Sequence, residues 1–187
     1  RAALLDGQGA YFAATNRGKK SVILNLKDEQ GQAVLRRLAS SADVLIESFR
    51  PGVLARLGLG YAELAAANPR LIVCAISGFG QDGPLSGRAG HDLNYLGYAG
   101  ALPLLAPRGG GQPIVPGLQL ADLGGGAFPA AIAILAALLE RERSGRGQLL
   151  GISMTANIVH WLALAAAQHW ATGSAPPGGR GPLSGGY

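Results

Sequence analysis

Hydrophobic and polar positions follow two different periods in the first half of the chain. The segments 21–26 (SVILNL), 43–48 (DVLIES) and 70–78 (RLIVCAISG) are short runs rich in branched apolar residues, which is typical of buried strands. Between them, 28–41 and 61–68 carry apolar residues at helical spacing. Strands separated by helices of this length form βαβ units, so we expect an α/β fold with a parallel, Rossmann-like sheet and flanking helices.

The second half is more helical. Turn-forming residues fill 78–84, a helix is predicted from about His91, and the Pro/Gly-rich stretch 103–117 is typical of a loop. Residues 120–147 predict a long buried helix that opens with Asp122 and three glycines and ends in a basic turn. A strand over 148–153 and a helix over 157–173 complete the predicted elements.

Composition limits the class of protein. With 187 residues, 48% hydrophobic and 14% charged, the chain fits one globular domain. Its net charge of +5 favours an anionic partner. Because the basic residues are scattered and form no block, a phosphorylated small molecule fits better than a nucleic acid. An Arg-rich and Ala-rich compositional bias with no partner remains the alternative origin of the charge.

Cysteine and histidine usage argue against disulfides and metals. Cys74 is the only cysteine and lies in an apolar run, which predicts a buried, inert thiol. The three histidines have no cysteine or acid cluster at ligand spacing, so we expect no metal site. The longest apolar run, 127–139, is shorter than the roughly 20 residues of a membrane span, and no signal peptide is visible. We expect a cytoplasmic protein without a membrane partner.

Two acids stand at predicted junctions between loop and helix. Asp92 follows Gly90 and His91, and Asp122 precedes Gly124–Gly126. Aspartate is a preferred helix N-cap, which accounts for both acids without any ligand. Three glycines at a helix start lower helix stability, so other atoms must approach them closely. Either a ligand at the helix N-terminus or tight packing between the helix and a strand, without a ligand, explains this.

The histidines also have ordinary structural explanations. His160 and His169 lie beside Trp161 and Trp170 in an apolar helix, where packing explains them best. His91 taken alone can be a structural histidine as well. The residues around it decide between these interpretations.

Several motifs together resemble the family III CoA-transferase superfamily, most closely its α-methylacyl-CoA racemases. They are NRGKKSVILNLK (16–27), ADVLIESFRPGVLARLGLG (42–60), NPRLIVCAISGFGQDGP (68–84), RAGHDLNYLGYAGAL (88–102), LADLGGG (120–126) and ERERSGRGQ (140–148). The resemblance covers about residues 15–172. It implies that 1–172 is a CoA-binding segment of the family's large domain without its leading strand. Residues 173–187 would then be a Gly/Pro-rich linker towards the family's small domain.

The resemblance implies catalytic roles for His91 and Asp122. Inverting the carbon next to a thioester requires removal of a proton on one face and its return on the other. Histidine exchanges protons near neutrality, and a carboxylate does so if burial raises its pKa. We therefore expect an acyl-CoA racemase, an isomerase of fatty acid metabolism that acts on 2-methylacyl-CoA thioesters through an enolate, with Gly124–Gly126 as hypothetical N–H donors to the enolate oxygen.

Two other functions stay open. In the CoA transferases of the superfamily the aspartate at the Asp122 position is a nucleophile that forms an acyl anhydride and then a thioester with CoA. Asp122 fits both reactions, whereas a transferase has no need of a base at His91. The third possibility is a CoA-binding remnant without catalysis, in which neither residue matters.

By the same resemblance, CoA as part of the substrate is the only cofactor-like group, and its binding residues are spread along the chain. They are Arg17, Leu24, Asn25, Leu26, Lys27, Glu47, Ser48, Phe49, Arg50, Arg56, Gly90, Asp92, Leu93, Asn94 and Tyr95. Arg17, Lys20 and Arg50 are expected to face the phosphates for electrostatic reasons. Asn25 stands where the family usually has Asp, and Gly151 and Ala156 stand where acids are common.

The resemblance also bears on assembly. Family members are interlaced homodimers whose active site lies between the large domain of one chain and the small domain of its partner. The small domain is expected to include a glutamate that orients the catalytic histidine. We therefore expect the 187-residue segment alone to lack a complete site.

Overall fold

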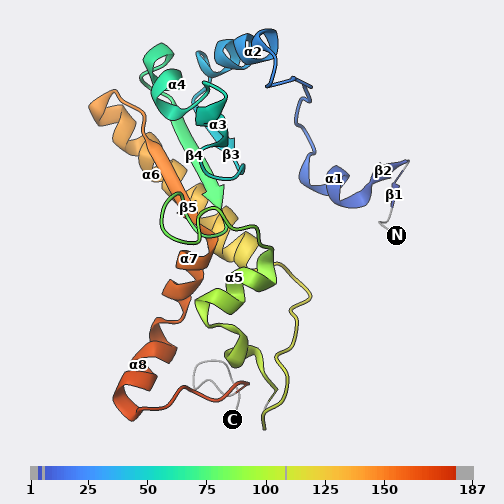
Figure 1. Ribbon diagram of the computed structural model, residues 1–187, viewed down its shortest axis with the longest axis vertical. Coiled ribbons are helices and arrows are strands. Elements are labelled where there is room, and N and C mark those ends of the chain that lie inside the picture. The colour runs from blue at the N-terminus through green and yellow to red at the C-terminus, as the bar shows by residue number, and fades with distance from the viewer. Residues whose placement is uncertain (1–3, 6, 108, 180–187) are drawn as a thin grey trace.

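The computed structural model describes residues 4–5, 7–107 and 109–179. Strands β1 (Leu4–Leu5) and β2 (Gln8–Gly9) pair antiparallel and lead into helix α1 (Ala10–Thr15). Figure 1 shows this N-terminal unit away from the main sheet, joined to it by an extended connection. None of its described residues contributes to the hydrophobic core clusters.

The central element is a parallel sheet of three strands, β3 (Val44–Glu47), β4 (Ile72–Ser77) and β5 (Leu149–Ser153). Their order is β3-β4-β5, with Val44 opposite Ile72 and Val73 opposite Leu149. The parallel α/β sheet and the strands predicted over 43–48, 70–78 and 148–153 are confirmed. Parallel pairing brings the carboxyl ends of all three strands to one edge, which is where open α/β sheets bind ligands.

The strand predicted over 21–26 is wrong. This segment is extended but pairs with no strand in the described part of the chain, and Val22 and Ile23 are 64% and 96% exposed. Branched residues favour an extended backbone, but a strand also needs a neighbour whose N–H and C=O groups complete the ladder. Only Leu26, at the end of the segment, packs against the core.

Helices cover both faces of the sheet. On one face lie α2 (Glu29–Ala39), α3 (Val53–Arg56) and α4 (Tyr61–Ala67), whose apolar side chains pack around Val73 of β4. On the other lies α6 (Phe128–Ser144), which packs through Ala130 against Cys74 and Ile152. Val73 and Cys74 point to opposite faces because side chains alternate along a strand.

A third cluster lies beyond the carboxyl ends of the strands. It joins α5 (Asp92–Ala99), the π-helix η2 (Leu120–Ala127) and α7 (Met154–Trp161), as Figure 1 shows for α5 and α7. The predicted helix over 157–173 is two helices, α7 and α8 (Ala163–Thr172), because the backbone leaves helical geometry at Leu162. The predicted loop 103–117 overlaps a short 3₁₀ helix, η1 (Leu102–Leu105).

The prediction of a fully buried helix after Asp122 is wrong for one side of α6. Phe128, Ile132, Leu135 and Leu139 are 65%, 68%, 62% and 73% exposed and form a stripe along the helix. No element of the described chain covers this side, although the small residues of the opposite side pack on the sheet. The continuous helix Leu120–Ser144 is long and apolar enough to cross a membrane, judged by length and composition only. Of its apolar 18-residue stretch, 28% is buried inside the protein.

The linker predicted over 173–187 stays a prediction. Its described part reaches η1, since the Gly179 N–H donates to the Leu104 carbonyl oxygen at 3.5 Å. Residues 180–187 lie outside the described residues.

Cys74 is expected to be unreactive in the folded protein. Its side chain is fully buried in β4, and burial, with the nearby Glu47 charge as a second cause, raises the pKa of the thiol. Both access and thiolate formation are therefore reduced. A colorimetric disulfide reagent should label Cys74 only after denaturant is added. Rapid stoichiometric labelling in native buffer would contradict this placement.

Candidate active site

The start of α5 holds His91 at the edge of the sheet where the strands end. His91 is the N-cap residue, and its backbone N–H donates to Asn94 Oδ1 at 2.9 Å while its carbonyl accepts the Asn94 N–H at 2.8 Å. These reciprocal bonds close the first turn of the helix. The His91 side chain itself is exposed.

Tyr95 anchors the backbone before His91. Its ring is buried, its hydroxyl donates to the Gly90 carbonyl oxygen, and it packs edge-to-face on Phe79 at 5.3 Å. A Cβ atom at Gly78 would lie 2.2 Å from the Tyr95 ring, and one at Gly90 would lie 2.7 Å from it. The two glycines are therefore required by the close fit of this ring, which fixes the backbone on which His91 stands.

Asp122 reaches the same region from η2. The backbone N–H groups of Ala121 and Asp122 donate to Asp92 Oδ1 at 2.7 and 2.9 Å, so the start of η2 is joined to the start of α5. Although the Asp122 side chain reaches solvent, desolvation by the surrounding protein raises the pKa of its carboxyl, and the Asp92 charge raises it further. The His91 charge acts on this pKa in the opposite direction. Because Asp92 directly follows His91 and accepts the Asp122 N–H, the backbones of His91 and Asp122 lie close together.

Tyr95 belongs to this group as well. Burial raises the pKa of the Tyr95 phenol, and the charges of Asp122 and Asp92 raise it further. The structure thus brings together four residues that lie up to 31 positions apart in the sequence. They are His91 at the N-cap of α5, Asp92 and Tyr95 on α5, and Asp122 on η2. This cluster holds two groups able to exchange protons and a third, Asp92, that is occupied by backbone hydrogen bonds.

Helix packing accounts for the three glycines after Asp122. All three are buried against α7, where Cβ atoms would lie 2.0 Å from the Trp161 ring at Gly124 and 2.5 Å from the Met154 carbonyl oxygen at Gly125. The Gly125 carbonyl oxygen also accepts a hydrogen bond from Asn157 Nδ2 at 2.7 Å. Tight packing is therefore confirmed, but the expectation of a strand as the partner is wrong, because the neighbouring element is the helix α7. The hypothesis that these N–H groups hold an enolate oxygen gains no support.

A methyl group at Gly125 is expected to destabilise the fold. Gly125→Ala forces the backbone of η2 away from the Met154 carbonyl, and overpacking of this kind costs about 1–3 kcal/mol. Chemical denaturation measures the change. Gly87→Ala is the matched control, since a Cβ there meets nothing within 4 Å. Equal stability of the two variants would contradict the packing.

The segment after β3 lies at the same edge of the sheet. Glu47 Oε2 accepts the Phe49 N–H at 2.7 Å, and burial raises the pKa of the Glu47 carboxyl against the opposing effect of this bond. Ser48, Phe49 and Arg50 are exposed. Their place beside the end of β4 agrees with the expected CoA-binding role, which stays a prediction.

The remaining expected CoA residues lie elsewhere. Leu24–Lys27 lead into α2, where the Lys27 N–H donates to Asn25 Oδ1 at 3.1 Å, and Arg17 follows α1. Figure 1 shows the connection from α1 to α2 well separated from α5. Arg56 is exposed on α3. The structure does not bring these residues beside His91, and their contacts with CoA stay predictions.

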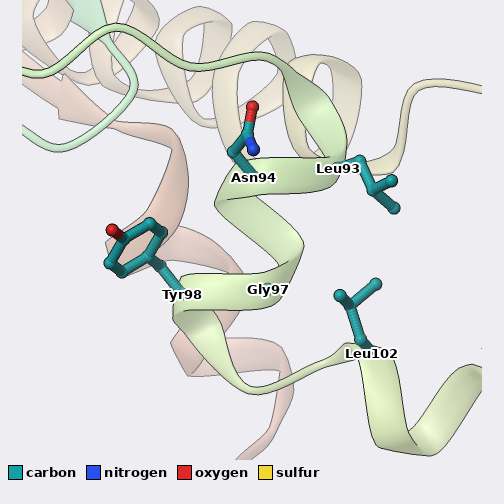
Figure 2. A pocket seen from close by; sticks show the side chains of 5 residues that line it. All are labelled: Leu93, Asn94, Gly97, Tyr98 and Leu102. Atoms are coloured by element: carbon teal, nitrogen blue, oxygen red, sulfur yellow. The ribbon is translucent and has the colours of Figure 1, made fainter.

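An open groove along α5 joins Leu93 and Asn94, which the sequence analysis expected to bind CoA, to Gly97, Tyr98 and Leu102, which it did not single out. It has a volume of about 390 Å³ and is lined by Leu93, Asn94, Gly97, Tyr98 and Leu102. In Figure 2, Leu93 and Leu102 lie on one side of the helix with Gly97 between them. The helical spacing of 93, 94, 97 and 98 was the available signal. The mostly apolar lining can accept an apolar part of a ligand.

The described part of the chain offers no set of side chains that could bind a metal ion. Within residues 4–5, 7–107 and 109–179, no three His, Cys, Asp or Glu side chains are grouped so as to hold a metal ion. The side chains of the cluster can instead transfer protons, and a carboxylate such as Asp122 can also act as a nucleophile.

Comparison with known proteins identifies related chains. A sequence model of CoA-transferase family III matches residues 1–187. The chain is 49% identical over 150 residues to alpha-methylacyl-CoA racemase from Mus musculus, covering 80% of this chain and 39% of that protein. The human racemase is 42% identical over 174 residues, covering 92% and 44%. Acetyl-CoA:oxalate CoA-transferase from Acetobacter aceti is 43% identical over 169 residues, covering 90% and 43%.

Solved structures confirm the fold. A CAIB/BAIF family protein from Brucella suis superposes with a TM-score of 0.85 at 38% identity, covering 93% of this chain and 46% of that one. The chain thus spans between 39% and 46% of the length of these relatives. Racemases and CoA transferases both occur among them.

Proposed function

Because the chain belongs to CoA-transferase family III, we propose that it forms part of an acyl-CoA racemase that inverts the α-carbon of 2-methylacyl-CoA thioesters. The observation that carries this proposal is the junction of α5 and η2. There Asp92, which directly follows His91, accepts the Ala121 and Asp122 N–H groups and so ties the start of α5 to the start of η2. Two groups able to exchange protons then stand at one place, on two different elements.

The reaction needs one group on each side of a single carbon. One group takes the α-proton, and the electron pair of the C–H bond moves into the thioester to form an enolate. The conjugate acid of the other group then donates a proton to the opposite face of the same carbon. The carbon regains its hydrogen with inverted configuration, and one proton has moved from one catalytic group to the other.

The environment suits the two groups to this exchange. The raised pKa of Asp122 allows its carboxyl to hold a proton at a higher pH than an ordinary aspartate and therefore to donate it. His91 is exposed beside it and can accept or donate at its imidazole nitrogens. The groove along the same helix supports an apolar acyl group as the substrate.

CoA transfer is the second candidate function. It is favoured by the relatives named as CoA transferases and by an Asp122 side chain that reaches solvent. In this reaction the Asp122 carboxylate attacks the thioester carbonyl, which releases CoA thiolate and forms a mixed anhydride. The thiolate then attacks the Asp122 carbonyl and releases the first acid, and the acceptor acid takes CoA by the reverse steps. His91 has no task in this sequence.

We also propose that the full-length protein is a homodimer, that it is located in the cytoplasm, and that its reaction belongs to lipid metabolism, as the family resemblance implies. CoA is proposed to lie along the edge of the sheet near Glu47–Arg50, with no further cofactor. Light scattering on the full-length protein tests the dimer.

One experiment distinguishes the racemase from the CoA transferase by measuring exchange of the α-proton and transfer of CoA. Full-length protein is incubated in D₂O with a 2-methylacyl-CoA of one configuration, and mass spectrometry measures deuterium at the α-carbon while chiral chromatography measures inversion. A parallel assay measures CoA transfer to free carboxylic acids. Deuterium incorporation with inversion supports the racemase. CoA transfer without deuterium incorporation would overturn it in favour of the second candidate.

A further inference from the structure

The carboxylate of Asp92 joins two elements that are distant in sequence. One oxygen, Oδ1, accepts both the Ala121 N–H at 2.7 Å and the Asp122 N–H at 2.9 Å, across 29 and 30 residues. These N–H groups lie in the first turn of η2 and have no acceptor within their own helix. The N-cap residue of η2, Gln119, makes no side-chain cap bond. The start of η2 is thus capped from another helix.

This cap sets where Asp122 stands. Ala121 is fully buried, so the backbone on one side of Asp122 is fixed by packing, and Asp92 fixes the Asp122 N–H itself. Asp92 is also the neighbour of His91, whose own N–H is held by Asn94. A single carboxylate therefore links the backbones of both proposed catalytic residues.

We propose that Asp92 is a positioning residue that holds the Asp122 carboxyl beside His91, a role resting on the proposed function. It does so through its hydrogen bonds to the η2 backbone and is not itself a contact of the substrate. This differs from the CoA-binding role expected for Asp92 from the sequence, because Oδ1 is already occupied by protein N–H groups.

The charge of Asp92 adds a second effect on the same group. After desolvation, it is the larger cause that raises the pKa of Asp122, and His91 opposes it. Among the described residues, Asp92 and the N-cap residue His91 are the charged groups that act on the pKa of Asp122. Tyr95, also on α5, interacts with the same two carboxyls. Burial is the main cause that raises the pKa of its phenol. Removal of the Asp92 charge should therefore lower the pKa of Asp122.

Two substitutions separate position from charge. Asp92→Ala removes the acceptor and should lower kcat for α-proton exchange by about 10²-fold, since small displacements of a catalytic group have effects of this size. KM should change little, because substrate contacts are kept. Asp92→Asn keeps an oxygen acceptor in the same place. It should retain most of the activity and move the limb of the pH–rate profile that Asp122 controls to lower pH.

Asp28 provides the matched control. Asp28 is the N-cap of α2 and accepts the Gln30 N–H of that same helix through Oδ1 at 2.9 Å, whereas Asp92 caps η2 from another helix. Asp28→Ala should leave kcat and the pH profile unchanged, although it too removes an aspartate that caps a helix, in this case within its own helix. If Asp92 had only a structural role, Asp92→Ala would behave like Asp28→Ala. Asp92→Asn would then show no shift of the pH–rate profile.

Each outcome decides the inference. Wild-type kcat and pH profile in both Asp92 variants overturn it, and so does an equal loss of kcat in Asp28→Ala. Where Asp92→Ala does not fold, the profile of Asp92→Asn decides alone. If the wild-type protein transfers CoA without α-proton exchange, the proposed function fails. The inference is then judged by the same variants in the transfer assay, since that reaction also depends on Asp122.

Discussion

Asp122→Asn is expected to lower the rate of α-proton exchange by about 10²- to 10⁴-fold, the usual contribution of a general acid–base group. The amide has the shape of the carboxyl but cannot take or give the proton. The backbone N–H of residue 122 still donates to Asp92, so the start of η2 should keep its structure. The measurement is deuterium incorporation into a 2-methylacyl-CoA by the full-length protein, with the unfolding midpoint as a check on folding.

The control for this variant is Asp82→Asn. Asp82 is exposed in the loop after β4, and the same change of charge there should leave exchange unaffected. CoA transfer would also be lost in Asp122→Asn, because an amide is not a competent nucleophile. Retention of full exchange by Asp122→Asn, with its fold intact, would exclude Asp122 from both mechanisms and favour a CoA-binding remnant or another site.

His91→Asn is expected to lower α-proton exchange by about 10²- to 10⁴-fold as well, since the second face of the carbon loses its proton carrier. Asparagine is chosen because it is a favoured N-cap, so α5 should still begin at the same residue. This variant separates the two candidate reactions, because CoA transfer should survive it.

His169→Asn on α8 is the matched control, and it should behave as wild type because His169 is exposed on a helix outside the cluster. Unchanged exchange in His91→Asn would contradict a two-base mechanism. Survival of CoA transfer together with absence of exchange in the wild-type protein would assign the enzyme to the transferases of the family.

Local patterns predicted those elements that neighbouring residues specify. The runs 43–48, 70–78 and 148–153 became strands because each is short and mostly apolar. The central strand β4 is buried, and β3 and β5, which are only partly buried, pair with it on either side. The run 21–26 has the same composition and is not a strand. Pairing depends on a partner strand that lies elsewhere in the sequence, and no periodicity within a segment reports whether that partner is present.

For the cluster of His91 and Asp122, too, the sequence predicted the residues but not the contacts that hold them. Residue type and motif spacing singled out both residues, and the family resemblance supplied their roles. The hydrogen bonds from Ala121 and Asp122 to Asp92 could not be predicted, since local capping at Asp92's own helix explained that acid equally well. The sequence showed that something approaches Gly124–Gly126 closely, but only the packing of Trp161 and Met154 identified it as a helix.

By itself, the sequence determined the parallel α/β class, the main helices and strands, and the residues able to exchange protons, because propensity, periodicity and side-chain chemistry are properties of neighbouring residues. The tertiary structure alone decided that 21–26 is left unpaired, that one side of α6 stays exposed, and that Asp92 holds the start of η2. These features depend on which distant surfaces meet. Such contacts form only when the chain folds back on itself, so their geometry cannot be predicted from any single segment of the sequence.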